Sequence, residues 1–166
     1  MLHMLGSRFS CWLLLGAALV LVINSGFEGA TPTGKDKSFQ VAPVGKPIAK
    51  DKKTTLLAFY RAIYGSKAQP SSIEIVKDKK QRKAWLAFQG GDQDSPTMAI
   101  ELQVEKGAYT FGISSAKNTC KGNPCSHCRW KWGYCACIGD GESCNHIGTG
   151  LKSVGSKPLA VVGLAG

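Results

Sequence analysis

Hydrophobic positions recur at helical spacing in one part of the chain, at residues 54–64. The apolar stripe consists of Leu56, Leu57, Tyr60, Ile63 and Tyr64. Thr54 is suited to cap the start of a helix there, and Gly65 is suited to end it. The pattern predicts one amphipathic helix that packs its apolar stripe on a sheet.

Farther along the chain the period becomes two, which predicts four short strands. They cover residues 72–77, 84–89, 97–105 and 108–113. The clearest alternation places Met98, Ile100, Leu102 and Val104 on one face of the third strand. The expected fold class is therefore α+β, with one helix on a four-stranded antiparallel meander, followed by a small, disulfide-rich and mostly irregular module.

The first 30 residues have the composition of an export signal. Residues 11–23 are apolar, and a helix of that length is roughly 20 Å long, too short for a hydrocarbon core of about 30 Å. We expect a signal peptide, with a retained N-terminal anchor as the alternative. The further expected parts are a flexible linker at 31–52, the helix and meander at 53–115, the cysteine-rich module at 116–152 and a tail at 153–166.

The chain is strongly basic, with 21 Lys and Arg against 11 Asp and Glu and a net charge of +10. Five basic residues crowd the first predicted hairpin turn, namely Lys77, Lys79, Lys80, Arg82 and Lys83. One interpretation is a contact for phosphate, lipid headgroups or acidic polysaccharide, and the other is a solvated hairpin tip. Nucleic acid is not an expected partner, because no aromatic side chains alternate with these basic residues.

Six of the seven cysteines are clustered near the C-terminal end, which predicts three disulfides in an exported chain. They are Cys120, Cys125, Cys128, Cys135, Cys137 and Cys144. The sequence leaves their pairing open, although Cys135 and Cys137 are expected to take different partners. Because this segment is rich in glycine and poor in aliphatic residues, cross-links are expected to substitute for a buried apolar core.

Two other uses of these cysteines are alternatives to the disulfides. Cys125 and Cys128 have the spacing of half a zinc site, and His127 and His146 are available as further ligands. The same two cysteines are also a candidate redox pair, since the histidine between them can lower a thiol pKa. The second cysteine pair has the spacing C-x-C, which argues against zinc, and no metal is expected.

Three aromatic residues lie between the cysteines, namely Trp130, Trp132 and Tyr134. Their simplest role is to pack on the disulfides. They are also a candidate aromatic binding face or the source of a modified-tryptophan cofactor.

The cysteine spacing is similar to that of one known family. Cys128-x6-Cys135-x-Cys137, followed by Cys144 and Gly-Thr-Gly-Leu at 148–151, resembles the first cysteine-rich stretch of methylamine and aromatic amine dehydrogenase light chains. The tail at 159–166 is similar to the end of those chains. The resemblance implies a periplasmic, disulfide-rich subunit of a family that oxidises amines with a quinone made from two tryptophans and passes electrons to a partner. No tryptophan here matches a cofactor position of the family, so the resemblance implies no catalytic residue.

These observations leave three hypotheses for an exported protein, periplasmic or secreted. The first is a light-chain-like subunit or accessory of an amine dehydrogenase or electron-transfer system. The second is a non-enzymatic, cationic protein that binds an anionic envelope component, and the third is a thiol–disulfide exchange protein.

No catalytic constellation is evident, so an enzymatic activity is left open. No cofactor is expected unless a tryptophan quinone forms. The expected partners are another subunit or an anionic envelope component, with membrane contact only through the leader.

Overall fold

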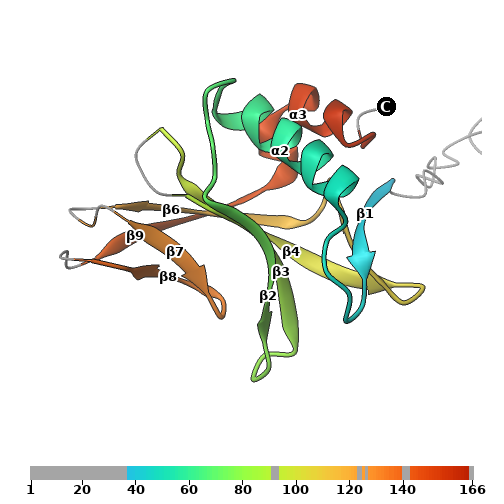
Figure 1. Cartoon of the computed structure of the whole chain (residues 1–166), viewed down its shortest axis with the longest axis horizontal. Helices are drawn as coiled ribbons and strands as arrows, with labels where there is room; N and C mark the ends of the chain where they lie inside the picture. Colours follow the sequence, from blue (N-terminus) through green and yellow to red (C-terminus); the bar gives the residue numbers. More distant parts are fainter. Residues whose placement is uncertain (1–36, 91–93, 123–124, 126, 140–142, 165–166) are drawn as a thin grey trace, which may run out of the picture. The chain divides into compact units, whose positions relative to one another are not determined.

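An antiparallel sheet of seven strands organises the chain (Figure 1). The computed structural model describes residues 37–90, 94–122, 125, 127–139 and 143–164. The strands of this sheet are β1 (Ser38–Pro43), β2 (Ser72–Asp78), β3 (Lys83–Gln89), β4 (Thr97–Glu105), β5 (Ala108–Gly112), β6 (Ala116–Gly122) and β9 (Cys144–Gly150). Strand β4 pairs with β3 on one edge, and its other edge is shared between β6 and β5. The outer pairs are β2 on β3, β1 on β5 and β9 on β6.

Helices cover one face of the sheet (Figure 1). They are α2 (Lys50–Tyr64), the 3-10 helix η1 (Leu151–Val154) and α3 (Ser156–Val161). The largest fully buried side chains between these two layers are Leu56, Phe59, Tyr60, Leu86, Phe88, Met98, Ile100, Phe111 and Leu151. Each such side chain contributes about 1.5–3 kcal/mol by leaving water, so this layer is the main core of the protein.

The opposite face of the sheet carries the cysteine-rich hairpin, formed by β7 (Cys128–Lys131) and β8 (Tyr134–Cys137). Strand β3 supplies both layers, because its side chains alternate between the two faces. Leu86 and Phe88 enter the helix-side core, whereas Trp85 and Ala87 pack with Trp130 and the buried cysteines. The disulfide-bonded layer therefore rests on the sheet.

The structure confirms the predicted fold class and the meander, because β2, β3, β4 and β5 pair in order and antiparallel. The helix also forms, but it begins at Lys50, four residues before the expected start. Thr54 is not its N-cap, since its hydroxyl donates to the carbonyl of Lys50 within the helix. Gly65 ends the helix at a φ of 107°, a conformation that glycine adopts readily.

Two other expectations differ from the structure. Part of the expected linker, residues 38–43, is strand β1, because Val41 and Ala42 are buried when this segment pairs with β5. The cysteine-rich module is not mostly irregular, since β6 and β9 extend the main sheet and the hairpin forms a sheet of its own. The expected tail contributes the end of η1 and all of α3. The predicted export signal lies outside the described residues.

Candidate functional site

All six clustered cysteines form disulfides, as the sequence predicted. The pairs are Cys120–Cys135, Cys125–Cys137 and Cys128–Cys144. Cys135 and Cys137 have different partners, again as expected. Three disulfides in a chain of this size are typical of an oxidising, extracytoplasmic environment.

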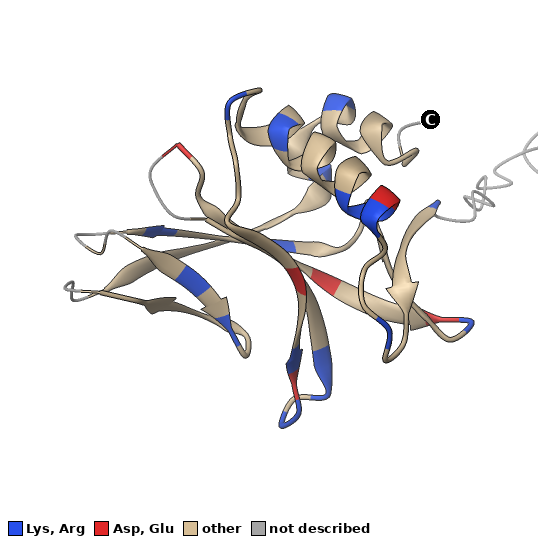
Figure 2. Cartoon of the chain, in the orientation of Figure 1, with Lys and Arg blue, Asp and Glu red and all other residues tan. Residues whose placement is uncertain are grey.

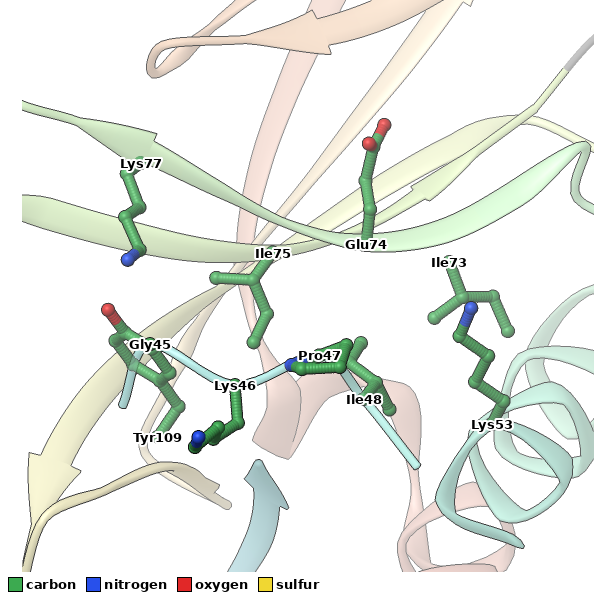
Figure 3. Close-up of a pocket in the computed structure, with 10 residues that line it drawn as sticks. All are labelled: Gly45, Lys46, Pro47, Ile48, Lys53, Ile73, Glu74, Ile75, Lys77 and Tyr109. Atoms are coloured by element: carbon green, nitrogen blue, oxygen red, sulfur yellow. The ribbon is translucent and has the colours of Figure 1, made fainter. Parts of the chain in front are cut away.

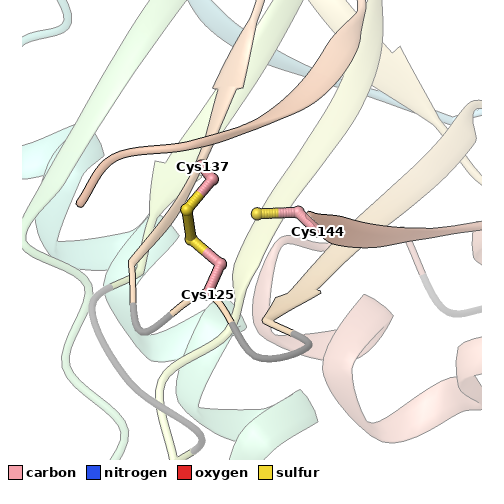
Figure 4. Close-up of side chains that lie close together, drawn as sticks. All are labelled: Cys125, Cys137 and Cys144. Atoms are coloured by element: carbon pink, nitrogen blue, oxygen red, sulfur yellow. A yellow bond between two sulfur atoms is a disulfide. The ribbon is translucent and has the colours of Figure 1, made fainter. Parts of the chain in front are cut away.

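The candidate redox pair is not brought together, because Cys125 bonds to Cys137 and Cys128 bonds to Cys144. The Sγ atoms of Cys125, Cys137 and Cys144 nevertheless lie within 4.8 Å of one another (Figure 4). Cysteine binds zinc as the deprotonated thiolate, and every sulfur in this group is already bonded to another sulfur in a disulfide. The cluster therefore does not fit a metal while its cysteines are joined in disulfides.

Among the described residues, the group of side chains close enough together to hold a metal contains neither of the two nearby histidines. His146 Nε2 lies 2.7 Å from Asn118 Oδ1, and its imidazole ring packs 5.5 Å from the ring of Trp130. The backbone carbonyl of His127 accepts a hydrogen bond from Ile138. The ring contacts of His146 fit a structural role better than a ligand role.

The three aromatic residues of the predicted aromatic site are divided between the interior and the surface. Trp130 is 1% exposed, whereas Trp132 is 61% and Tyr134 is 50% exposed. Trp130 packs on Trp85, a residue that the sequence pattern had assigned only to a strand. The alternation of β3 was the signal for this second layer, because Trp85 and Leu86 cannot both face the helix.

The predicted cationic turn forms an ordered hairpin tip between β2 and β3. The carboxylate of Asp78 is buried and accepts hydrogen bonds from the backbone N–H groups of Lys80 and Gln81. A Cβ atom added to Gly133 would lie 3.6 Å from Asp78 Oδ2. The turn between β7 and β8 therefore lies against the base of the β2–β3 turn.

Not all of the predicted anion-binding residues are free to meet a ligand. Lys83 forms an ion pair with Glu101 at 2.9 Å, and Lys77 Nζ lies 5.7 Å from the ring centroid of Tyr109. Apart from Lys77 and Lys83, the exposed basic and aromatic residues of the two neighbouring hairpins are Lys79, Lys80, Arg82, Arg129, Lys131, Trp132 and Tyr134. We call these seven residues the hairpin-tip surface, and Figure 2 shows the basic positions on both hairpins.

The comparisons with known proteins identify no relative of this chain. No family model, curated protein or solved structure matches the chain. Among the described residues, no helix has both the length and the apolar character needed to cross a membrane.

Proposed function

We propose that this chain is an exported, non-enzymatic binding protein, periplasmic or secreted, that attaches to an anionic component of the cell envelope. The contact is the hairpin-tip surface. Its ligand carries closely spaced phosphate or carboxylate groups, as anionic lipid headgroups and acidic polysaccharides do.

The observation that carries this proposal is the concentration of positive charge from two hairpins that are distant in sequence. Residues 77–83 contain five basic side chains and residues 128–137 contain two, and the only acidic residue in either segment is Asp78. That carboxylate is turned inward to the backbone of its own turn. A multivalent anion could therefore meet cations from both hairpins at once.

The backbone at Trp132 supports the same conclusion. Trp132 has a φ of 46°, which is unfavourable for a bulky side chain and is normally left to Gly or Asn. Strained residues of this kind cluster at functional sites, and Arg82 of the same surface also has a positive φ, of 55°. An exposed indole next to Arg129 and Lys131 suits an amphipathic interface, since it presents an apolar body and a polar N–H.

The experiment measures binding of the oxidised protein to vesicles of phosphatidylglycerol and, in parallel, to alginate. The test variant is Lys79→Gln/Lys80→Gln/Arg82→Gln. Each basic residue near an anionic surface contributes about 1 kcal/mol, so the variant should bind about 100-fold more weakly. Binding should also weaken steeply with added salt.

A matched control separates this surface from net charge alone. The control variant Lys67→Gln/Lys152→Gln/Lys157→Gln removes the same charge from three exposed positions outside the two hairpins. It should lose much less affinity than the test variant. Equal losses in the two variants would show that no particular surface binds the anion, and the proposal would be wrong.

The resemblance to amine dehydrogenase light chains remains a second proposal, supported by the cysteine spacing. Its cofactor would require two tryptophans in contact. Trp130 contacts Trp85, with ring centroids 4.9 Å apart, whereas Trp132 is exposed, and no tryptophan here matches a cofactor position of the family. Thiol–disulfide exchange between Cys125 and Cys128 gains no support from the structure, because these residues belong to different disulfides.

A further inference from the structure

A cleft of about 340 Å³ lies beside strand β2, at a distance in sequence from the β7–β8 hairpin (Figure 3). One wall is β2, and the other is the segment that follows β1, with contributions from α2 and β5. The lining residues are Gly45, Lys46, Pro47, Ile48, Lys53, Ile73, Glu74, Ile75, Lys77 and Tyr109. None of these belongs to the hairpin-tip surface.

Strand β2 presents an unpaired backbone edge to this cleft. Among the described residues it pairs only with β3. In an antiparallel pair, alternate N–H and C=O groups of an edge strand point away from its partner. Such an edge accepts a further strand from another chain when nothing blocks it.

The floor of the cleft is apolar. Ile73 and Ile75 project from the same face of β2 and are half-buried against the helix-side core. Pro47 and Ile48 face them from the opposite wall (Figure 3). An extended ligand would place every second side chain on this floor.

The charged groups that line the cleft are mainly ammonium groups, from Lys46, Lys53 and Lys77. In Figure 3, Lys53 and Lys77 lie near opposite ends of the exposed stretch of β2. The single carboxylate among the lining residues, Glu74, points away from the cleft and accepts a hydrogen bond from Gln89 Nε2 at 2.9 Å. The cleft therefore complements an apolar segment with negative charge at each end.

We propose that this cleft binds an extended peptide segment of a partner protein, with an apolar centre between acidic residues, which adds to β2 as an antiparallel or parallel strand. Backbone hydrogen bonds to β2 hold the segment, its apolar side chains cover Ile73 and Ile75, and its carboxylates meet the lysines. This site is separate from the hairpin-tip surface and takes a different class of ligand.

The probe is the fluorescein-labelled peptide Asp-Thr-Val-Thr-Val-Thr-Asp, whose alternate residues are acidic at the ends and apolar in the middle. Its binding to the full, oxidised protein is measured by fluorescence polarisation. The charge-reversed peptide, with Lys at both ends, should bind about tenfold more weakly or not at all. Bound peptide should also slow hydrogen exchange of the backbone amides of β2.

Backbone pairing is tested with two N-methylated versions of the probe, one at odd and one at even positions. Only one set of peptide N–H groups faces β2 in a strand pair, so one version should lose binding and the other should keep it. Equal binding of both versions would overturn strand addition and indicate an acidic ligand that uses the lysines alone. A doubling of molecular mass without binding of the probe would also overturn the proposal and assign the edge to a second copy of this chain.

The protein variant is Lys46→Gln/Lys53→Gln, which should weaken probe binding about tenfold. The control Lys152→Gln/Lys157→Gln removes the same charge outside the cleft and should leave the affinity unchanged. Because Lys46 and Lys53 are not part of the hairpin-tip surface, the cleft variant should still bind phosphatidylglycerol vesicles. Peptide binding therefore tests the cleft, and vesicle binding tests the hairpin-tip surface.

Discussion

The indole rings of Trp85 and Trp130 meet edge to face, with ring centroids 4.9 Å apart. Trp85 belongs to β3 of the main sheet and Trp130 to β7 of the cysteine-rich hairpin. Gln89 strengthens the same junction, because its side-chain amide donates to the carbonyl of Trp130 and accepts from the N–H of Trp130. The disulfide-rich part is thus a layer packed on the sheet, and an apolar contact contributes to its stability beside the cross-links.

Replacing Trp130 with Ala should therefore destabilise the whole protein. Truncation of a fully buried large aromatic residue typically costs about 3–5 kcal/mol, and Trp130 is 1% exposed. The measurement is the free energy of unfolding in guanidinium chloride with the disulfides intact. Tyr134→Ala, on the neighbouring strand but half exposed, is the control and should cost much less. Similar values for the two variants would mean that the junction contributes little.

Removal of one disulfide tests how much the cross-links contribute beside this contact. Cys128 and Cys144 are 16 residues apart in sequence, and closing a loop of that size restricts the unfolded chain by about 3 kcal/mol. The variant Cys128→Ser/Cys144→Ser should lose roughly that amount, while the far-UV circular dichroism of the main sheet and helices is retained. Complete unfolding of this variant under native conditions would show that the sheet depends on the cysteine layer.

The sequence predicted most of the helix-side core and little of the opposite layer, for physical reasons. Met98, Ile100 and Leu102 are buried on one face as their alternation indicated, but Val104 is 62% exposed, because β4 continues beyond the part covered by the main core. Strand β1 was missed because its polar and glycine-rich surroundings carry no periodicity. Its pairing with β5 joins segments about 70 residues apart, such as Phe39 and Phe111.

The candidate site was predicted in its parts and not in its arrangement. The basic residues at 77–83 and the six cysteines were evident from residue type and spacing. Their juxtaposition was not, because the contact between Asp78 and the turn at Gly133 depends on how the hairpin lies across the sheet. The disulfide pairing was likewise undetermined, since spacing alone does not choose among the possible partners.

Ionisation of Tyr64 makes the free energy of unfolding depend on pH in the alkaline range. Burial raises the pKa of its phenol above the ordinary value of 10.0, and its hydrogen bond with Thr119 partly opposes this shift. Above pH 10.0 the unfolded chain releases a proton that the folded chain retains, so stability falls as pH rises through the folded pKa. Tyr64→Phe should lack this loss, although it should cost about 1 kcal/mol at neutral pH through the missing hydrogen bond.

The measurement for Tyr64 is the difference in unfolding free energy between the parent protein and Tyr64→Phe across the alkaline range. The difference cancels the opposite effect of Lys117, whose pKa is lowered from 10.5 by burial and which therefore adds stability as pH rises toward that value. The gap between the two proteins should narrow above pH 10.0. A constant gap would show that Tyr64 ionises equally in the folded and unfolded states.

The intact mass of the exported protein distinguishes the envelope-binding proposal from the amine dehydrogenase resemblance. Three disulfides remove six hydrogen atoms, two for each bond. We expect this loss alone, with all six hydrogens regained on reduction. Added oxygen or a further loss of hydrogen assigned to Trp130 or Trp132 by peptide mapping would instead support a tryptophan-derived quinone.

One substitution at Trp132, in the strained turn between β7 and β8, tests both the stability of the protein and its binding to vesicles. Asn tolerates a φ near 46° better than Trp does, and Asn-Gly is a favoured pair for a two-residue hairpin turn. Trp132→Asn should therefore raise the unfolding free energy, by about 1 kcal/mol, while weakening binding to phosphatidylglycerol vesicles. Lys106→Asn is the matched control, because Lys106 also has a positive φ before a glycine, at the turn between β4 and β5. This control should gain stability and lose less binding, since its turn lies outside the hairpin-tip surface. If both variants gain stability and bind equally, the indole at position 132 takes no part in the contact.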